Sequence, residues 1–202
     1  MFQVRIHGRG GQGVVAAAEI LSMAAFDEGR YAQAFPSFGS ERMGAPVVSY
    51  CRIDDRPIRT HEPIAEPDAL IVQDATLVHQ VDLFGGLGDD AYVLVNMSKS
   101  LEGLGLAEFV SGFRAGRLVT CPATALALEH VGRPLPNAAL LGGFAALTGR
   151  ISLDALEKAD TERFPGAVGT ANATAARAAY RHVADETRIG RDRGVATHAP
   201  AD

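Results

Sequence analysis

The residues with the clearest potential for chemistry form a glycine-rich segment near the N-terminus, Gly8-Arg9-Gly10-Gly11-Gln12-Gly13. Glycine tolerates positive φ angles and lets the backbone approach a ligand closely. A helix that begins after such a turn presents unpaired N–H groups and the positive end of its dipole to an anion, and Arg9 would add a charge-assisted hydrogen bond to a phosphate. The segment therefore predicts an anion or phosphate site, with a tight turn that only brings helix and sheet together as the alternative.

The G-x-G-x-x-G spacing also occurs in nicotinamide dinucleotide sites, which require one more feature. They need an acidic residue about 20 positions further on, at the end of the second strand, to hold a ribose hydroxyl. The segment Tyr31–Phe35 contains no acid, and Asp27 and Glu28 come earlier, on the expected helix. The sequence therefore favours an anion site of another kind over a dinucleotide site.

Elsewhere the sequence shows no pattern of metal ligands or nucleophiles. Iron–sulfur clusters are typically held by about four thiolates, and the two cysteines of the chain, Cys51 and Cys121, are far apart in the sequence. Both are expected to be buried and inert, and His7 is expected to be an ordinary hydrogen-bonded histidine. Glu41 and Arg42 lie in a polar loop, where they could contact a ligand, form an interface ion pair or remain solvated.

A strand before the glycine segment and a helix after it must position this candidate site. Phe2–His7 alternates apolar and polar residues, and apolar residues recur at helical spacing from Val14 until Gly29 ends the helix. Further strands are expected at Tyr31–Phe35, Pro46–Ile53, Ala69–Gln73, Ala91–Asn96 and Arg117–Pro122, with Arg56–Arg59 as a short hairpin partner. Further helices are expected at Thr76–Phe84, Ala123–Val131, Asn137–Thr148, Leu153–Phe164 and Ala171–Arg188, with Asn137 and Ser152 as N-caps. This alternation predicts an α/β fold.

Length and composition fit one folded domain. The chain has 202 residues, of which 47% are hydrophobic and 21% charged, a balance typical of globular proteins. The net charge of −5 argues against nucleic-acid binding, and no apolar run is long enough to span a membrane. No signal peptide precedes the first expected strand, which favours a cytoplasmic location. We expect the domain to occupy residues 1–189 and the polar segment 190–202 to be a disordered tail.

Taken in order, several segments of the chain resemble the gamma subunit of pyruvate:ferredoxin oxidoreductase and its relatives among the 2-oxoacid:ferredoxin oxidoreductases. The resembling segments are His7-Gly8-Arg9-Gly10-Gly11-Gln12-Gly13, Tyr31-Ala32-Gln33-Ala34-Phe35-Pro36, Glu41-Arg42, Gly44-Ala45-Pro46, Arg52-Ile53-Asp54-Asp55-Arg56-Pro57-Ile58, Ile71-Val72-Gln73-Asp74 and Asn137-Ala138-Ala139-Leu140-Leu141-Gly142. The resemblance extends from Phe2 to Val183 and is densest in the N-terminal half.

The resemblance implies a single α/β domain around a mixed sheet that is closed or barrel-like, in a subunit that is not catalytic alone. Thiamine diphosphate and iron–sulfur clusters would lie on partner subunits of alpha, beta and delta type, and electrons would pass to ferredoxin or another acceptor. The complex would convert a 2-oxoacid and coenzyme A into an acyl-coenzyme A and CO2. This chain would bind no cofactor alone and would contribute assembly and the coenzyme A side of the site, through Gly8–Gly13 and Arg42.

The loop before Arg42 departs from the family pattern. Ser37 and Ser40 stand where pyruvate-type relatives often carry bulkier or more charged residues. Pyruvate is therefore the leading substrate, with phenylglyoxylate and 2-oxoglutarate as open alternatives. Hypotheses of another class are a free-standing dinucleotide-binding module and a non-catalytic scaffold whose glycine turn binds nothing.

Overall fold

The computed structural model describes residues 1–37, 43–99 and 111–197, with side chains as far as residue 189. The strands are β1 (Phe2–Arg9), β2 (Tyr31–Pro36), β3 (Pro46–Asp54), β4 (Ala69–Val72), β5 (Tyr92–Asn96) and β6 (Leu118–Cys121). The helices are α1 (Val14–Asp27), the short 3-10 helix η1 (Ala75–His79), α3 (Ala123–Val131), α4 (Asn137–Thr148), α5 (Leu153–Arg163) and α6 (Ala167–Thr197). The element order is that of an α/β domain, as the sequence predicts.

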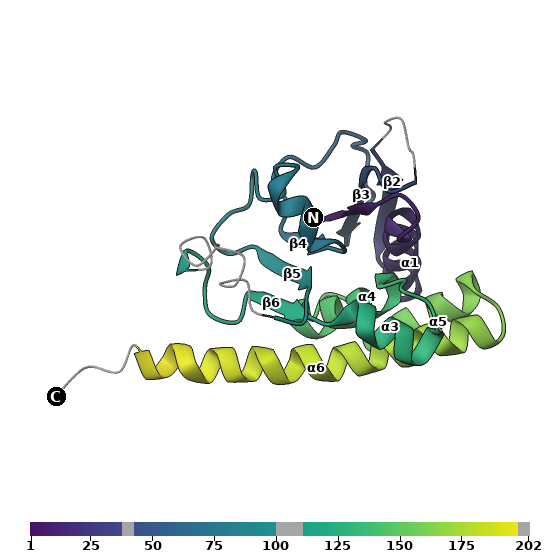
Figure 1. Cartoon of the computed structure of the whole chain (residues 1–202). Coiled ribbons are helices and arrows are strands. Elements are labelled where there is room, and N and C mark those ends of the chain that lie inside the picture. The colour runs from purple at the N-terminus through teal and green to yellow at the C-terminus, as the bar shows by residue number, and fades with distance from the viewer. Residues whose placement is uncertain (38–42, 100–110, 198–202) are drawn as a thin grey trace.

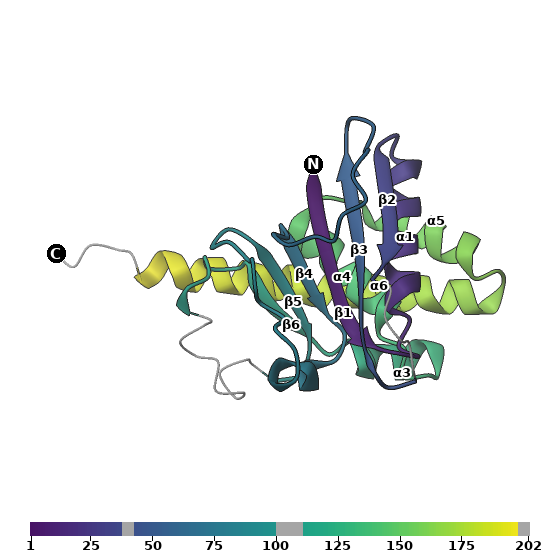
Figure 2. The same ribbon diagram turned by 90° about the horizontal axis from the view of Figure 1, so that it is seen from above.

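The strands form one open, mixed sheet in the order β2-β3-β1-β4-β5-β6, seen from above in Figure 2. β1 lies inside the sheet, antiparallel to β3 with Val4 opposite Cys51, and parallel to β4 with Ile6 opposite Ile71. The closed or barrel-like sheet implied by the resemblance is therefore wrong for the described strands. Closure requires the two edge strands to meet, and here β2 and β6 are separated by all the other strands.

Helices cover one face of the sheet, and the segment between β4 and β5 covers part of the other (Figure 1). Val4 and Ile6 of β1 point into the larger apolar core, together with side chains of α1, α4 and α6. On the opposite face, Leu70 and Val72 of β4 pack with Leu77 of η1 in a smaller apolar core. Because successive side chains enter different cores, β4 is apolar along its whole length.

α4 lies between the sheet and α6 and is buried on nearly all sides (Figure 1). Its contact with α6 depends on glycine, because a Cβ at Gly142 would overlap the carbonyl oxygen of Ala176. The facing surface of α6 carries small side chains, and Ala175, Ala176 and Ala179 are fully buried. Close packing of small residues therefore fixes the distance between these two helices.

Most of the predicted elements are confirmed, with small shifts at their ends. α3 has the predicted bounds, and Gly29 follows α1 with a φ of 74°. Ser152 caps α5, because its hydroxyl oxygen accepts a hydrogen bond of 3.2 Å from the N–H of Ala155. Across the described ranges, no helix combines the length and the apolar character that crossing a bilayer would require.

Three local expectations are wrong. The helix expected over Thr76–Phe84 is reduced to η1, and beyond η1 the carboxylate of Asp82 accepts a hydrogen bond from the Gly85 N–H in a turn. Arg56–Arg59 is not a strand, because β3 already pairs with β1 on one side and β2 on the other. Asn137 does not cap α4; Pro136 holds the N-cap position and Asn137 is the first helical residue.

α6 is longer at both ends than the expected Ala171–Arg188. No proline interrupts the chain between Pro165 and Pro200, so the helix can continue. Its bounds include residues 190–197 of the segment 190–202, for which a disordered tail stays a prediction. Residues 198–202 lie outside the described residues.

Candidate functional site

The glycine segment is the turn that links β1 to α1, and its conformation depends on glycine. Gly11 and Gly13 have φ angles of 94° and 77°, in the left-handed region that side chains disfavour. Gly8 has a different reason, because a Cβ there would lie 2.6 Å from Cγ2 of Val14. The predicted strand, glycine turn and helix are therefore confirmed.

The N-terminus of α1 has no side-chain cap among the described residues. Gly13 is the N-cap, the first turn carries no acidic residue, and the Ala17 N–H donates to the Gly13 carbonyl oxygen at 2.9 Å. The N–H groups of residues 14–16 come before that bond and have no acceptor within the helix. These residues line an open depression of about 350 Å³ together with Gly10 and Gly11. Unpaired N–H groups and a positive dipole end make this depression suited to an anion.

Arg9 is not the free cation that the sequence suggests. Its Nε donates to Oδ2 of Asp74 at 3.0 Å, and its side chain is only 21% exposed. The other guanidinium nitrogens donate to the carbonyl oxygen of Gly44 at 3.1 Å, to Oγ1 of Thr76 at 2.7 Å and to Oε1 of Gln80 at 3.1 Å. Arg9 therefore ties the glycine turn to the segment that follows β4.

Asp74 is the centre of this network, although the sequence analysis did not single it out as a site residue. Its Oδ2 accepts hydrogen bonds from Arg9 and from Nε2 of Gln12, and its Oδ1 accepts from the N–H and hydroxyl of Thr76. Burial alone would raise the pKa of Asp74, but the hydrogen bonds from Thr76 and Gln12 and the charge of Arg9 outweigh it and lower the pKa. One signal was available: Asp74 follows closely on a fully buried strand.

Gln12 joins the network from the turn itself. Its Oε1 accepts a hydrogen bond of 2.8 Å from the Arg9 N–H, while its Nε2 donates to Asp74 at 2.9 Å. The turn is closed further by a 3.0 Å bond from the Gln12 N–H to the Arg9 carbonyl oxygen. The side chains of Arg9 and Gln12 thus hold an anion, and that anion is the carboxylate of Asp74.

The network crosses the gap between the carboxyl ends of β1 and β4. These strands are parallel neighbours, but α1 leaves β1 toward the helical face, whereas η1 leaves β4 toward the opposite face. In open α/β sheets, ligands bind at such a topological switch point. The glycine turn and Asp74 therefore meet at the place where the fold itself favours a ligand site.

Three polar side chains near this gap, those of Gln73, Asn137 and His7, are largely buried, and of these only Gln73 was not singled out from the sequence. Gln73 is 1% exposed, and neither polar atom of its amide has a hydrogen-bond partner among the described residues. Asn137 is 5% exposed and lies beside Gly13. His7 was expected to be hydrogen-bonded, but its buried Nε2 has no partner in the described part of the chain. Burial, together with the charge of Arg5, lowers the pKa of His7 to about 4, so the ring is neutral at pH 7.

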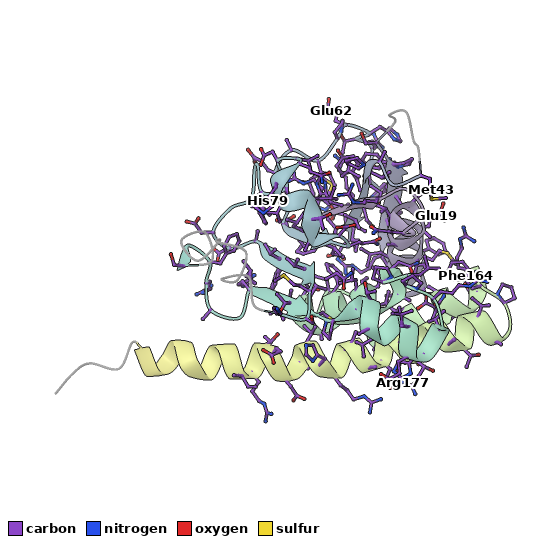
Figure 3. The ribbon with its side chains drawn as sticks, viewed as in Figure 1. Glu19, Met43, Glu62, His79, Phe164 and Arg177 are labelled. Carbon is purple, nitrogen blue, oxygen red and sulfur yellow. The ribbon has the colours of Figure 1, made fainter. Side chains whose placement is uncertain are left out.

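The loop between β2 and β3 carries the rest of the predicted site. Glu41 and Arg42 lie outside the described residues. Met43 follows them, is 87% exposed (Figure 3) and forms a parallel bridge with Gly10. The Gly10 N–H donates to the carbonyl oxygen of Ala45 at 2.9 Å. The C-terminal end of this loop is therefore fastened to the glycine turn.

The cysteines are buried, as the sequence predicts. Burial raises the pKa of both Cys51 and Cys121 to about 12, so the two thiols stay protonated at neutral pH. Within the ranges that the structure covers, no group of three or more His, Cys, Asp or Glu side chains is placed to hold a metal ion.

Comparisons with known proteins agree on one family. The profile of the family described as pyruvate ferredoxin/flavodoxin oxidoreductase matches residues 3–182. The chain is 48% identical to the pyruvate synthase subunit PorC of Methanothermobacter thermautotrophicus over 183 residues, which cover 91% of this chain and 96% of that protein. It is also 48% identical to the pyruvate/ketoisovalerate oxidoreductases common subunit gamma of Thermococcus kodakarensis over 180 residues, which cover 89% and 96%.

Solved structures support the same assignment. The pyruvate oxidoreductase subunit PORC of Thermotoga maritima matches with a TM-score of 0.73 and 36% identity, covering 89% of this chain and 95% of that one. A 2-oxoglutarate:ferredoxin oxidoreductase from Magnetococcus marinus, solved with 2-oxoglutarate, coenzyme A and succinyl-CoA bound, matches with a TM-score of 0.68 over 91% of this chain and 31% of that one. At 15% identity, this second likeness shows the fold alone. On the family profile and the curated relatives, the chain belongs to the pyruvate ferredoxin/flavodoxin oxidoreductase family and matches its gamma-type subunits over nearly their whole length.

Proposed function

We propose that the chain is the gamma subunit of a 2-oxoacid oxidoreductase complex that acts on pyruvate and contributes to assembly and to the coenzyme A side of the site. The complex converts pyruvate, coenzyme A and an oxidised acceptor into acetyl-coenzyme A, CO2 and a reduced acceptor. The pyruvate assignment is supported by the names of relatives that are 48% identical to this chain. Partner subunits of alpha, beta and delta type would hold thiamine diphosphate and the iron–sulfur clusters, and ferredoxin or another acceptor would take the electrons.

One observation carries the coenzyme A assignment: an uncapped helix N-terminus opens into a depression at the topological switch point. Coenzyme A carries phosphate groups, which need N–H donors and a positive potential. The first N–H groups of α1 provide both, and the absence of an acidic residue in the first turn leaves the dipole uncompensated. We therefore assign a phosphate of coenzyme A to the depression that Gly10, Gly11, Gly13 and residues 14–16 line.

The contacts of Arg9 change the role that the sequence suggested for it. Arg9 is one of the residues that line the depression, but its donors are already engaged with Asp74, Gly44, Thr76 and Gln80. Its charge still adds to the positive potential, although Asp74 offsets part of it. In this proposal, backbone N–H groups supply the direct phosphate contacts, and Arg42 remains a proposed contact from the neighbouring loop.

A nicotinamide dinucleotide module is disfavoured by the position of β2. In the dinucleotide fold, the strand after the first helix lies directly beside the first strand and presents an acid to the ribose. Here β3 lies between β1 and β2, and β2 carries no acidic residue. β2 therefore has neither the acidic residue nor the position beside β1 that such a site requires.

The coenzyme A assignment is tested by placing a charge at the mouth of the depression. Val15→Glu adds a negative charge to the first turn of α1, which suits the helix dipole but repels a phosphate. Val15→Gln is the matched control, because the glutamine side chain has nearly the same size as that of glutamate but carries no charge. In steady-state kinetics of the reconstituted complex, we expect Val15→Glu to raise the KM for coenzyme A about tenfold or more, with little change for pyruvate. An equal KM for both variants would remove the depression from the coenzyme A site.

A further inference from the structure

Asp74 holds the glycine turn through bonds that span a long stretch of sequence. It joins the end of β4 to Arg9 and Gln12 at separations of 65 and 62 residues. Its side chain is 16% exposed and that of Arg9 is 21% exposed, so water screens this pair less than an open surface pair. The glycines of the turn carry no side chains that could fix it, so the turn depends on its backbone hydrogen bonds and on the side chains of Arg9 and Gln12.

We propose that Asp74 is a positioning residue, whose carboxylate holds Arg9 and Gln12 across the switch point and so keeps the first N–H groups of α1 facing the depression. This inference rests on the proposed function of the depression. Asp74 is not among the residues that line the depression, and it acts through Arg9, which lines it, and through Gln12.

An opposite role for Asp74 predicts the opposite result. If its carboxylate competed with the ligand for Arg9, removing the charge would free Arg9 and strengthen phosphate binding. The geometry favours positioning, because Arg9 has three further hydrogen bonds to Gly44, Thr76 and Gln80 that do not involve Asp74. Arg9 would therefore keep these three hydrogen bonds, and the loss of the carboxylate would weaken only the connection between the glycine turn and the residues that follow β4.

The principal variant is Asp74→Asn in the reconstituted complex, with Asp82→Asn as the matched control. Asp82 also accepts a backbone hydrogen bond in the segment between β4 and β5, from Gly85 at 2.9 Å, but it does not touch the turn. We expect Asp74→Asn to raise the KM for coenzyme A about tenfold, as for the loss of a charged hydrogen bond, while kcat at saturating coenzyme A changes less than about twofold. The control should leave both constants unchanged.

A second substitution separates positioning from a merely local structural role. Gln12→Glu in the Asp74→Asn background exchanges the amide and the carboxylate across the same contact. Oε1 can still accept from the Arg9 N–H, and the amide of residue 74 can now donate to the new carboxylate. We expect the double variant to recover at least half of the lost apparent affinity for coenzyme A. Asp74 is also the N-cap of η1. If that were its only role, the double variant would not recover affinity for coenzyme A.

The outcomes distinguish this inference from the function on which it rests. If Val15→Glu leaves the KM for coenzyme A unchanged, the proposed function fails. If Val15→Glu raises it but Asp74→Asn does not, or lowers it, the positioning role alone is overturned. If Asp74→Asn prevents assembly, Gln12→Leu tests the same joint in an assembled complex, and an unchanged KM there contradicts the inference.

Discussion

Asp160 of α5 allows a direct test of how burial sets the stability of this fold. Its side chain is fully buried, and neither carboxylate oxygen has a hydrogen-bond partner among the described residues. Burial, with the negative charge of Glu157 nearby, raises the pKa of Asp160 from 3.8 to about 7. That difference corresponds to about 4 kcal/mol, which is the order of the destabilisation that an ionised Asp160 imposes on the folded chain.

The sign follows from proton linkage. Since the folded state binds the Asp160 proton more tightly, this contribution to stability is complete below the unfolded pKa of 3.8 and is lost as the pH rises through about 7. His7 acts in the opposite direction, because its pKa of about 4 means that stability is lost as the pH falls below its ordinary 6.5. Asp160→Asn removes only the first effect. We expect the variant to be more stable than the natural chain by up to about 4 kcal/mol at pH 8 and nearly equal to it at pH 4.

Urea unfolding at a series of pH values measures this difference directly. His7 is common to both proteins, so its effect cancels when the two free energies of unfolding are subtracted. Asp154→Asn, an exposed position on the same helix, is the control and should show little pH-dependent difference. A free-energy difference for Asp160→Asn that is the same at pH 4 and pH 8 would refute the reasoning.

Two further predictions concern packing and autonomy. Gly142→Ala should lower the free energy of unfolding by about 1–3 kcal/mol, because the added Cβ overlaps the Ala176 carbonyl oxygen and forces α4 and α6 apart. Gly149→Ala is the control: the space around Gly149 is open and its φ is 61°, so the substitution should cost only about 1 kcal/mol in the same denaturation assay. The isolated chain should contain no iron and should not oxidise 2-oxoacids, and stoichiometric iron by elemental analysis of the pure subunit would contradict this expectation.

Local features of the fold were predictable because they depend on neighbouring residues. The strand, the glycine turn and α1 follow from one continuous pattern, and the Ser152 cap needs only the residues that follow it. The sheet order was not predictable, because nothing local in β2 or β3 shows that β3 lies between β1 and β2. The end of helix after η1 was not predictable either, because apolar spacing does not reveal the side-chain turn in which the Asp82 carboxylate accepts a hydrogen bond from the Gly85 N–H.

For the candidate site, the sequence predicted the place but not the partners. Glycine conformations and the uncapped helix start are local properties, and both are confirmed. The engagement of Arg9 by Asp74 depends on a parallel pairing of β1 with β4, which brings together residues far apart in the chain. The Arg9 side chain could bind a ligand freely only if no acidic residue followed the strand that pairs with β1. Which strand that is depends on the order of strands in the sheet, which the local sequence does not show.

The burial of α4 has a consequence for the order of events during synthesis. α4 is apolar around its whole circumference, and one of its sides is covered by α6, which comes after α4 and α5 in the chain. A growing chain that has not yet released α6 from the ribosome would expose that apolar side to solvent, where it invites association with chaperones or other nascent chains. The α4–α6 contact reaches Val183, whose side chain lies against Gly143. The core around α4 is therefore complete only after the chain has been synthesised at least as far as Val183.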